Sequence, residues 1–216
     1  MTDWAAWGTS AGTLALAGVT LAAVRSSNRS ARLAERALLA GLRPALAPTR
    51  PGEPAEQVQF ADGTVFPVGE GRALVREQDG VIYLAMPLRN VGAGMARLQG
   101  YRLEGQSVEE VERDPLGRAR HRRGDVMPEP ASFREQQRDV YVPAGDVGFW
   151  QAALRDPESE LYRQLSTALR TRGRVTVDLL YTDHEGGQQT ITRFVLLPDG
   201  DDTERWRCDV TRHWTL

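Results

Sequence analysis

Two patterns of hydrophobic residues divide this chain near residue 43. From Trp4 to Val24 the sequence carries no charged residue. From Arg43 onward, short apolar runs alternate with polar residues and are separated by turn-forming residues, a pattern typical of β-strands. The change of pattern predicts a helical N-terminal segment followed by one β-rich domain over 43–216.

The uncharged segment 4–24 has the length of a transmembrane helix. At 1.5 Å per residue, a helix of about 20 residues crosses the hydrocarbon core of a bilayer. Trp4 and Trp7 lie at one end, where indole rings favour the lipid–water boundary, and Arg25 closes the other end. A cleaved signal peptide would begin with basic residues, and the tail 1–3 has none. We therefore predict an uncleaved membrane anchor.

Four arginines follow the anchor and predict its orientation. They are Arg25, Arg29, Arg32 and Arg36. Because basic residues flank the cytoplasmic end of a transmembrane helix, we expect the N-terminus outside and the C-terminal domain in the cytoplasm, at the plasma membrane. Residues 25–42 keep a helical period, with the arginines on one side and leucines and alanines on the other, before Gly41 and Pro44 end the helix.

Two features of the helical segment allow alternative interpretations. The arginine stripe can rest on anionic lipid head groups, or it can be a solvated face that only sets the topology. Gly8 and Gly12 form a Gly-x-x-x-Gly pair, whose spacing lets two membrane helices approach closely. This pair predicts a homodimer through the transmembrane helix, unless it merely reflects a sequence rich in glycine and alanine.

The rest of the chain predicts an antiparallel β-sandwich. Several strands with few helices between them favour this architecture. The predicted strands are 45–47, 65–68, 72–77, 81–89, 96–104, 139–142, 174–182, 189–197 and 205–214. Residues 78–80 and 185–187 contain the glycines typical of hairpin turns.

Two stretches interrupt the β pattern. Residues 145–172 predict a helical insertion, in which Phe149, Trp150, Ala153 and Leu154 share one helical face. A second helix is expected to start at Pro157 with Asp156 as its N-cap. Residues 113–138 contain almost no apolar side chains, and we predict a mobile surface loop there.

The segment Leu84-Ala-Met-Pro-Leu-Arg-Asn90-Val-Gly92-Ala-Gly94-Met-Ala96 is similar to a turn of immunoglobulin-like sandwich domains in bacterial surface proteins. In that turn, Asn and Gly allow positive φ angles where one strand ends and the next begins. The strand around Tyr181, with the glycines that follow it, also resembles those domains. The whole layout resembles uncharacterised actinobacterial single-pass membrane proteins with a small sandwich. The resemblance implies a fold and transfers no catalytic site.

Composition excludes some classes of function. The formal net charge of the chain is −2, and all 27 basic residues are arginine. Without a basic field, we expect no nucleic-acid partner. The arginines of the predicted loop (Arg118, Arg120, Arg122 and Arg123) are not interleaved with aromatic residues. A solvated loop is the default interpretation of them, and an electrostatic contact with a membrane or an acidic partner is the alternative.

The sequence contains no motif of a metal site, a cofactor site or a catalytic nucleophile. The possible metal ligands Asp183, His184, Cys208, Asp209 and His213 lack the spacing of known zinc or metalloprotease motifs. Cys208, as a lone cysteine, is expected to be a small buried hydrophobe. We therefore predict no metal, no cofactor and no catalytic residue.

Two hypotheses of function remain. The first is a membrane-anchored, non-catalytic binding or scaffold module that presents its sandwich to a protein partner of unknown identity. The alternative is a membrane-tethered enzyme with a site near His184, Arg207 and His213. Such a site requires that these three side chains come within hydrogen-bonding reach of one another.

Overall fold

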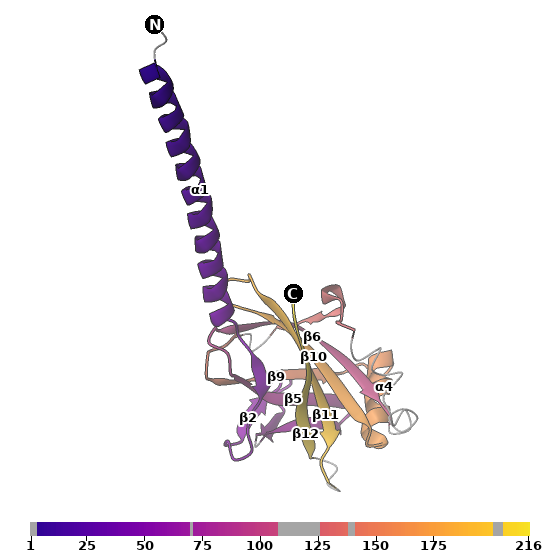
Figure 1. The fold of residues 1–216 in the computed structure, drawn as a ribbon. Coiled ribbons are helices and arrows are strands. Elements are labelled where there is room, and N and C mark those ends of the chain that lie inside the picture. The colour runs from indigo at the N-terminus through magenta and orange to yellow at the C-terminus, as the bar shows by residue number, and fades with distance from the viewer. Residues whose placement is uncertain (1–3, 70, 108–125, 138–140, 201–204) are drawn as a thin grey trace. The chain divides into compact units, whose positions relative to one another are not determined.

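The computed structural model of this chain describes residues 4–69, 71–107, 126–137, 141–200 and 205–216, without the side chains of 4–19, 36, 39 and 40. The chain divides into two compact units, Met1–Leu42 and Arg43–Leu216. Figure 1 shows a long helix, α1, in the first unit and a β-rich second unit.

The first unit is built on α1 (Trp4–Gly41), so the predicted anchor and the helix that follows it form one continuous helix. Over the residues that the structure describes, no helix has the length and apolar character that crossing a membrane requires. Most of the predicted span 4–24, with Gly8 and Gly12, lies outside the described side chains. The prediction of a transmembrane helix is therefore not confirmed.

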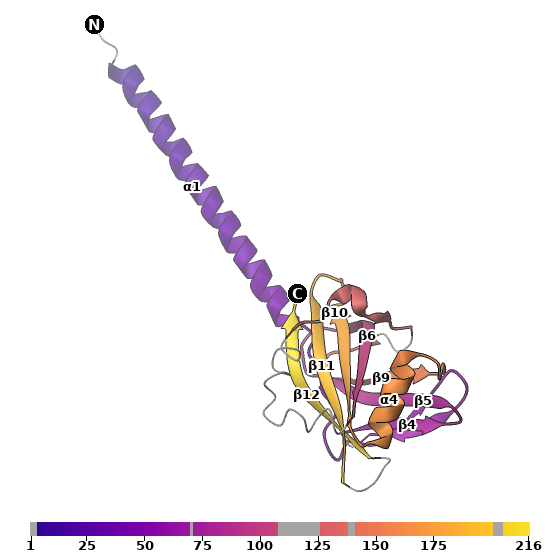
Figure 2. The same ribbon diagram turned by 90° about the vertical axis from the view of Figure 1, so that its right-hand side faces the viewer.

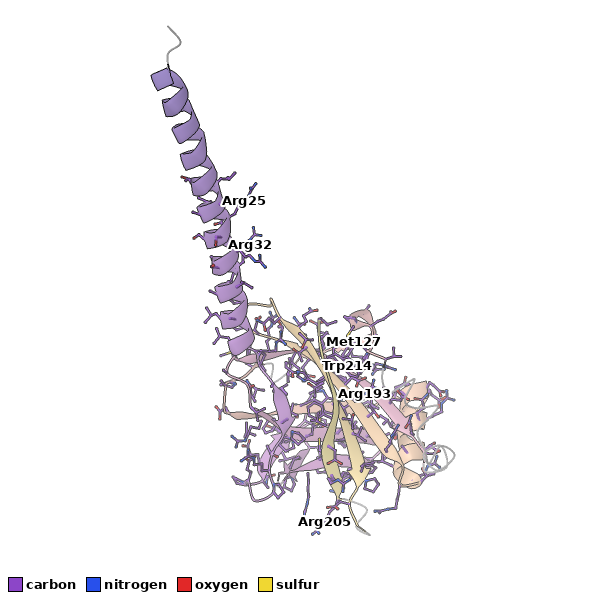
Figure 3. The ribbon with its side chains drawn as sticks, in the orientation of Figure 1. Arg25, Arg32, Met127, Arg193, Arg205 and Trp214 are labelled. Carbon is purple, nitrogen blue, oxygen red and sulfur yellow. The ribbon has the colours of Figure 1, made fainter. Side chains whose placement is uncertain are left out.

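The described side chains of α1 are exposed. Arg25, Arg29 and Arg32 are all exposed, and Figure 3 labels the first and the last of them on one side of the helix. Arg36 lies outside the described side chains. Leu33 and Leu38 are 56% and 64% exposed. The basic and the apolar side chains that the structure describes in residues 25–42 are therefore both exposed within this unit, and the two-sided character of this helix stays a prediction.

The second unit is mainly antiparallel β-sheet, which agrees with the fold class predicted from the sequence. Its described strands are β1 (Leu46–Pro48), β2 (Glu56–Gln59), β3 (Val65–Val68), β4 (Arg72–Gln78), β5 (Val81–Asn90), β6 (Ala96–Gln106), β7 (Arg134–Glu135), β8 (Tyr141–Val142), β9 (Val147–Leu154), β10 (Arg174–Thr182), β11 (Gln189–Pro198) and β12 (Trp206–Thr215). Among the described residues of this unit, the 3₁₀ turn η1 (Pro130–Ser132) and the helix α4 (Glu160–Arg170) accompany the strands.

The strands form one long sheet and one separate hairpin. The long sheet has the order β1-β5-β4-β12-β11-β10-β6-β7, with β9 paired to β5 and β8 paired to β6. Strands β4 and β12 join its two parts through only two residue pairs, Ala73 with Trp206 and Arg72 with Arg207. The sheet can therefore fold over at this junction and enclose a core, as the predicted sandwich requires.

Two hydrophobic clusters lie on opposite faces of β5. The main core includes Leu84, Met86, Trp150, Leu179 and Phe194, all essentially inaccessible to solvent. Helix α4 covers one side of this core, and Figure 2 shows it beside β4 and β5. The second cluster forms where the hairpin β2–β3 packs on the other face of β5. Both faces of β5 are therefore buried.

This double burial overturns the prediction of a helix over residues 147–154. The segment is strand β9, paired with β5 along its whole length. Trp150, Ala152 and Leu154 face the main core, whereas Phe149 and Ala153 pack against the second cluster. Because apolar side chains occur on both faces, the strand loses its alternation and its sequence imitates a helix.

The helical part of the predicted insertion begins later than expected. Ser159, and not Asp156, is the N-cap of α4, since its hydroxyl accepts the N–H of Tyr162 at 3.3 Å. Asp156 forms a turn before the helix, where its side chain accepts the N–H of Glu158 at 3.1 Å. Pro157 lies inside this turn, because an aspartate can cap a turn as readily as a helix.

The predicted mobile loop 113–138 is only partly described. Residues 113–125 and 138, with the arginines at 118–123, lie outside the described residues. Residues 126–137 are not an open loop, because β7 pairs with β6 and Gln136 donates its N–H to the carbonyl of Gln99 at 3.0 Å. Gly100 makes this contact possible, since a Cβ there would lie 2.7 Å from the carbonyl oxygen of Arg134.

Most predicted strands agree with the structure, and both predicted hairpin turns lie between paired strands. Asp79 and Gly80 have φ angles of 51° and 74°, as a tight hairpin between twisted strands requires. Strand β2 was not predicted from the sequence, because it presents only one buried side chain, Val58. The pair Asp62-Gly63, which joins β2 to β3, is the signal that could have revealed it.

Candidate functional site

The structure does not bring His184, Arg207 and His213 together. His184 lies in the β10–β11 turn, where its exposed ring is 3.8 Å from Glu185. His213 lies near the end of β12, opposite Thr192. Arg207 lies six residues earlier on the same strand, which is about 20 Å away at the rise of a β-strand. The enzyme site proposed around these three residues is therefore not assembled.

The possible metal ligands are also dispersed. No group of three or more His, Cys, Asp or Glu side chains is placed to hold a metal ion within the part of the chain that the structure describes. Cys208 is buried, and burial raises the pKa of its thiol to about 12. Asp183 caps the β10–β11 turn, because its carboxylate accepts the N–H of Gly187 at 2.8 Å.

A row of arginines crosses the outer face of the long sheet instead. Arg207 on β12 is directly opposite Leu197 on β11 and Arg72 on β4. Arg174, the first residue of β10, pairs with Gln106 on β6. The next residue of β10, Val175, pairs with Leu196 on β11, so the register places Arg174 beside Leu197. Directly opposed residues point to the same face of a sheet. Because Trp206 and Ala73 are buried in the core, this row faces away from it.

Arg172 brings a fourth guanidinium to the row from the end of α4. The helix ends at Arg170, and the N–H groups of Arg172 and Gly173 close its last turn on the carbonyls of Leu169 and Ala168. Arg172 has a φ angle of 52°, in the left-handed region where a helix usually ends in glycine or asparagine. A side chain with a Cβ costs roughly 1 kcal/mol there. The sequence thus keeps an arginine at a position that would be more stable as glycine.

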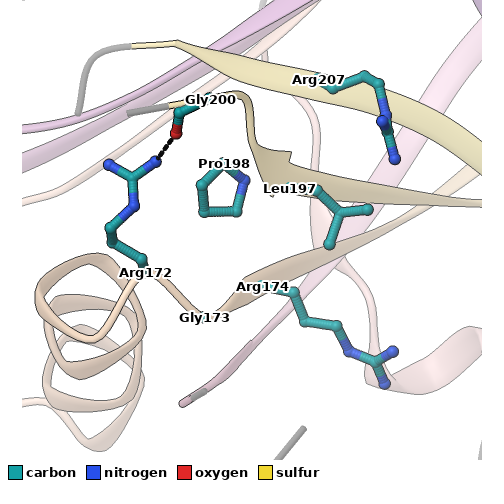
Figure 4. Close-up of a pocket in the computed structure, with 7 residues that line it drawn as sticks. All are labelled: Arg172, Gly173, Arg174, Leu197, Pro198, Gly200 and Arg207. Carbon is teal, nitrogen blue, oxygen red and sulfur yellow. Dashed lines mark hydrogen bonds between the residues drawn. The ribbon is translucent and has the colours of Figure 1, made fainter. Parts of the chain in front are cut away.

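Two arginines of the row, Arg174 and Arg207, line a pocket of about 400 Å³ together with Arg172. Its wall includes Arg172, Arg174 and Arg207 from three different elements. Figure 4 shows Leu197 and Pro198 between Arg172 on one side and Arg174 and Arg207 on the other. The pocket thus has an apolar floor with guanidinium groups on both sides.

Each of these arginines also has an acceptor in the chain. Arg172 donates to the carbonyl of Gly200, Arg174 donates to the side chain of Gln106, and Arg207 donates to Asp209 at 3.0 Å. The connection after β11 is acidic in sequence, with Asp199, Asp201, Asp202 and Glu204. Residues 201–204 lie outside the described part of the chain. An anion that enters the pocket must therefore compete with acceptors of the protein itself.

A second arrangement of polar groups holds the first residues of the domain, directly after α1 in the chain. Arg43 donates to Gln188 at 3.0 Å and to Thr215 at 3.1 Å. The N–H of Ala45 is bound by Asn90, and the N–H of Leu46 donates to the hydroxyl of Tyr181. The residues that follow the helix are therefore fixed to the body of the domain by side chains of several strands.

The contact at Leu46 continues as a chain of hydrogen bonds to His213. The hydroxyls of Tyr181 and Thr192 are 2.9 Å apart, and Thr192 Oγ1 is 2.9 Å from His213 Nδ1. When each hydroxyl donates to the next group, Nδ1 of His213 accepts the last hydrogen bond, which requires a neutral ring. Burial, and then the charge of Arg43, lower the pKa of His213 below its usual 6.5.

This chain of hydrogen bonds predicts a loss of stability in mild acid. The unfolded chain takes up a proton on His213 near pH 6.5, whereas the folded protein resists protonation because its histidine pKa is lowered. The free energy of unfolding is therefore expected to fall as the pH drops below 6.5. Urea unfolding at pH 7.5 and at pH values down to 5 measures the effect.

His213→Gln is the matched control for this prediction, because a glutamine can accept the hydroxyl of Thr192 but does not titrate. This variant should lose part of the pH dependence between 6.5 and 5. Identical pH profiles for the two proteins would rule out a contribution of His213.

Comparisons with known proteins give no relative for this chain. No family model matches it, and neither the curated proteins nor the solved structures include a match. The resemblance of residues 84–96 to immunoglobulin-like domains therefore stays a prediction.

The arginine row was not predicted from the sequence. Arg72, Arg174 and Arg207 are each more than 30 residues apart in the sequence, and they lie on three different strands. Only the strand register places them side by side. One local signal was available, because Arg172 precedes Gly173 at the end of a predicted helix, where glycine normally follows the last helical residue directly.

Proposed function

We propose that this protein is a non-catalytic binding module that α1 holds at the cytoplasmic face of a membrane. One observation carries the proposal most directly: the residues immediately after α1 are fixed to the domain by Arg43, Asn90 and Tyr181. A helix that is anchored in a bilayer would therefore hold the domain at a defined point of its surface. A loosely attached tail would not need these contacts.

The sequence of α1 supports the anchor. Residues 4–24 carry no charge, whereas Arg25, Arg29 and Arg32 follow at once and are exposed. This order favours a helix whose first half lies in lipid and whose second half lies in the cytoplasm. A second copy of the chain, paired through Gly8 and Gly12, is part of the same proposal.

The domain supports a binding role. Its arginine row and pocket are formed by rigid strands and by the end of α4, and such a framework positions side chains precisely. We assign the domain to the immunoglobulin-like sandwiches, because Asn90 organises the turn between β5 and β6 through its side chain. Sandwiches of this kind use loops and outer faces to contact partners.

Alkaline extraction of isolated membranes tests the anchor. The wild-type chain should stay in the membrane pellet. A variant with Leu14→Arg and Leu16→Arg should be released, since each arginine at the centre of a membrane helix costs about 3 kcal/mol. The matched control is Leu33→Arg with Leu38→Arg, which makes the same changes on α1 beyond Arg25. Release of the wild type, or of both variants alike, would contradict the anchor.

A pull-down from detergent-solubilised membranes tests the scaffold role. The wild type is expected to retain a stable partner that a variant with a changed pocket, Arg207→Gln, retains less well. A chain that purifies without any partner under mild conditions would count against a scaffold.

A further inference from the structure

We infer that the pocket between α4 and the ends of β10, β11 and β12 binds a ligand with at least two negatively charged oxygen groups, such as a diphosphate. This inference names a ligand for the binding function proposed above, and it does not depend on the membrane anchor. The pocket, the row of arginines and the backbone of Arg172 support it separately.

The first support is the concentration of like charge. Arg207 and Arg72 are directly opposite each other on neighbouring strands, where two like charges repel each other. Both arginines interact with other groups of the chain, Arg207 with Asp209. Arg172, Arg174 and Arg207 place three guanidinium groups at one pocket.

The second support is the geometry of the pocket. A volume of about 400 Å³ suits a small molecule. Guanidinium groups bind the oxygens of phosphates and carboxylates through paired N–H donors. Leu197 and Pro198 lie between Arg172 and the other two arginines, so the guanidinium groups flank the pocket on two sides (Figure 4). A ligand with two charged groups can contact both sides.

The third support is the conformation of Arg172. Its positive φ angle is unfavourable for any residue with a Cβ, and glycine would relieve it. An arginine near a helix C-terminus also interacts favourably with the helix dipole, but Arg170 already occupies the last turn of α4. A function for the side chain at the pocket accounts for the strained position.

The alternative is that these arginines only balance the acidic connection 199–204. This alternative and the inference differ in one measurable respect. A pocket that is saturated by its own carboxylates does not bind an added anion, whereas a ligand site does. If the pocket is a ligand site, replacing an arginine that lines it should weaken anion binding more than replacing another exposed arginine.

The experiment is a calorimetric titration of the full-length protein, purified in detergent, with inorganic pyrophosphate. We expect saturable binding with a dissociation constant below about 1 mM. Arg172→Gly and Arg207→Gln should each weaken binding about tenfold or more, because each removes a charged donor. Arg163→Gln is the matched control, since Arg163 is exposed on α4 and is paired with Glu160 at 3.0 Å. It should change the affinity less than about twofold.

Further measurements separate the possible outcomes. Arg172→Gly should also raise the urea midpoint of unfolding, since glycine suits the left-handed position, so weaker binding by this variant cannot result from misfolding. A titration with citrate, a carboxylate ligand, is compared with the titration with pyrophosphate. The anion that binds more tightly shows whether the pocket prefers carboxylate or phosphate groups. Absence of saturable binding, or an equal loss of affinity in Arg163→Gln, would overturn the inference. Neither result would affect the membrane extraction that tests the anchor.

Discussion

Replacing Asp178 by asparagine is expected to lower the free energy of unfolding by about 3–5 kcal/mol, because it removes the carboxylate charge that pairs with the buried guanidinium of Arg193. The two residues are directly opposite each other on β10 and β11. Arg193 Nε lies 2.6 Å from Oδ1 of Asp178, and Nη2 lies 2.8 Å from Oδ2. The side chains are only 10% and 3% exposed. The guanidinium also lies 5.2 Å from the ring centre of Trp214.

A double replacement separates the cost of an unpaired charge from the value of the pair. Asp178→Leu combined with Arg193→Met removes both charges and keeps a similar volume, so its stability should lie within about 1 kcal/mol of the wild type. Urea unfolding of the wild type, the single variant and the double variant gives the comparison. A double variant as unstable as Asp178→Asn would mean that the pair itself stabilises the fold.

Asn90→Ala is expected to cost about 3–4 kcal/mol, because it removes four hydrogen bonds from a side chain that solvent does not reach. The amide oxygen of Asn90 accepts the N–H groups of Ala45 and Gly92, each at 3.1 Å. Its amide nitrogen donates to the carbonyls of Gly94 at 2.7 Å and Val142 at 3.0 Å. One side chain thus connects the start of the domain, the β5–β6 turn and β8.

The control for this prediction is Gln78→Ala, which truncates a side-chain amide at the exposed end of β4. Its only side-chain hydrogen bond that the structure describes is a long one, 3.4 Å, to Asp79. Unfolding in urea should show a change of less than about 0.5 kcal/mol for this control. A similarly small change for Asn90→Ala would show that the turn is held by its backbone alone.

The sequence predicted the strands well wherever one face of the strand is polar or where a turn marks its end. Strand β3 and strand β10 have the expected bounds, because alternating apolar residues and adjacent turns define both. Strand β9 was mistaken for a helix, since the hairpin β2–β3 buries its second face. The contact between that hairpin and β9 joins segments that are distant in the sequence. The hydrophobic pattern of residues 147–154 therefore does not indicate it.

The candidate site was harder to predict than the fold. Histidine and cysteine are common catalytic residues and metal ligands, so they were the first candidates in the sequence. In the structure, His184 is exposed in a turn and Cys208 is buried. The arginines of the pocket do not stand out among the 27 arginines of the chain. Their proximity follows from the pairing of β4 with β12 and of β10 with β6, which depends on contacts between distant segments.

The orientation of the chain at the membrane gives the most direct test of the central proposal. The natural cysteine is a poor reporter, because Cys208 is buried and its thiol pKa is raised to about 12. We therefore replace it by alanine and introduce one cysteine at a time, Thr2→Cys before α1 or Glu185→Cys in the exposed β10–β11 turn. A membrane-impermeant maleimide is then added to intact cells.

The proposal predicts that the reagent labels Thr2→Cys in intact cells and labels Glu185→Cys only after the membrane is permeabilised. Labelling of Glu185→Cys in intact cells, with Thr2→Cys protected, would contradict the cytoplasmic placement of the domain. Protection of both cysteines until permeabilisation would contradict a helix that crosses the membrane.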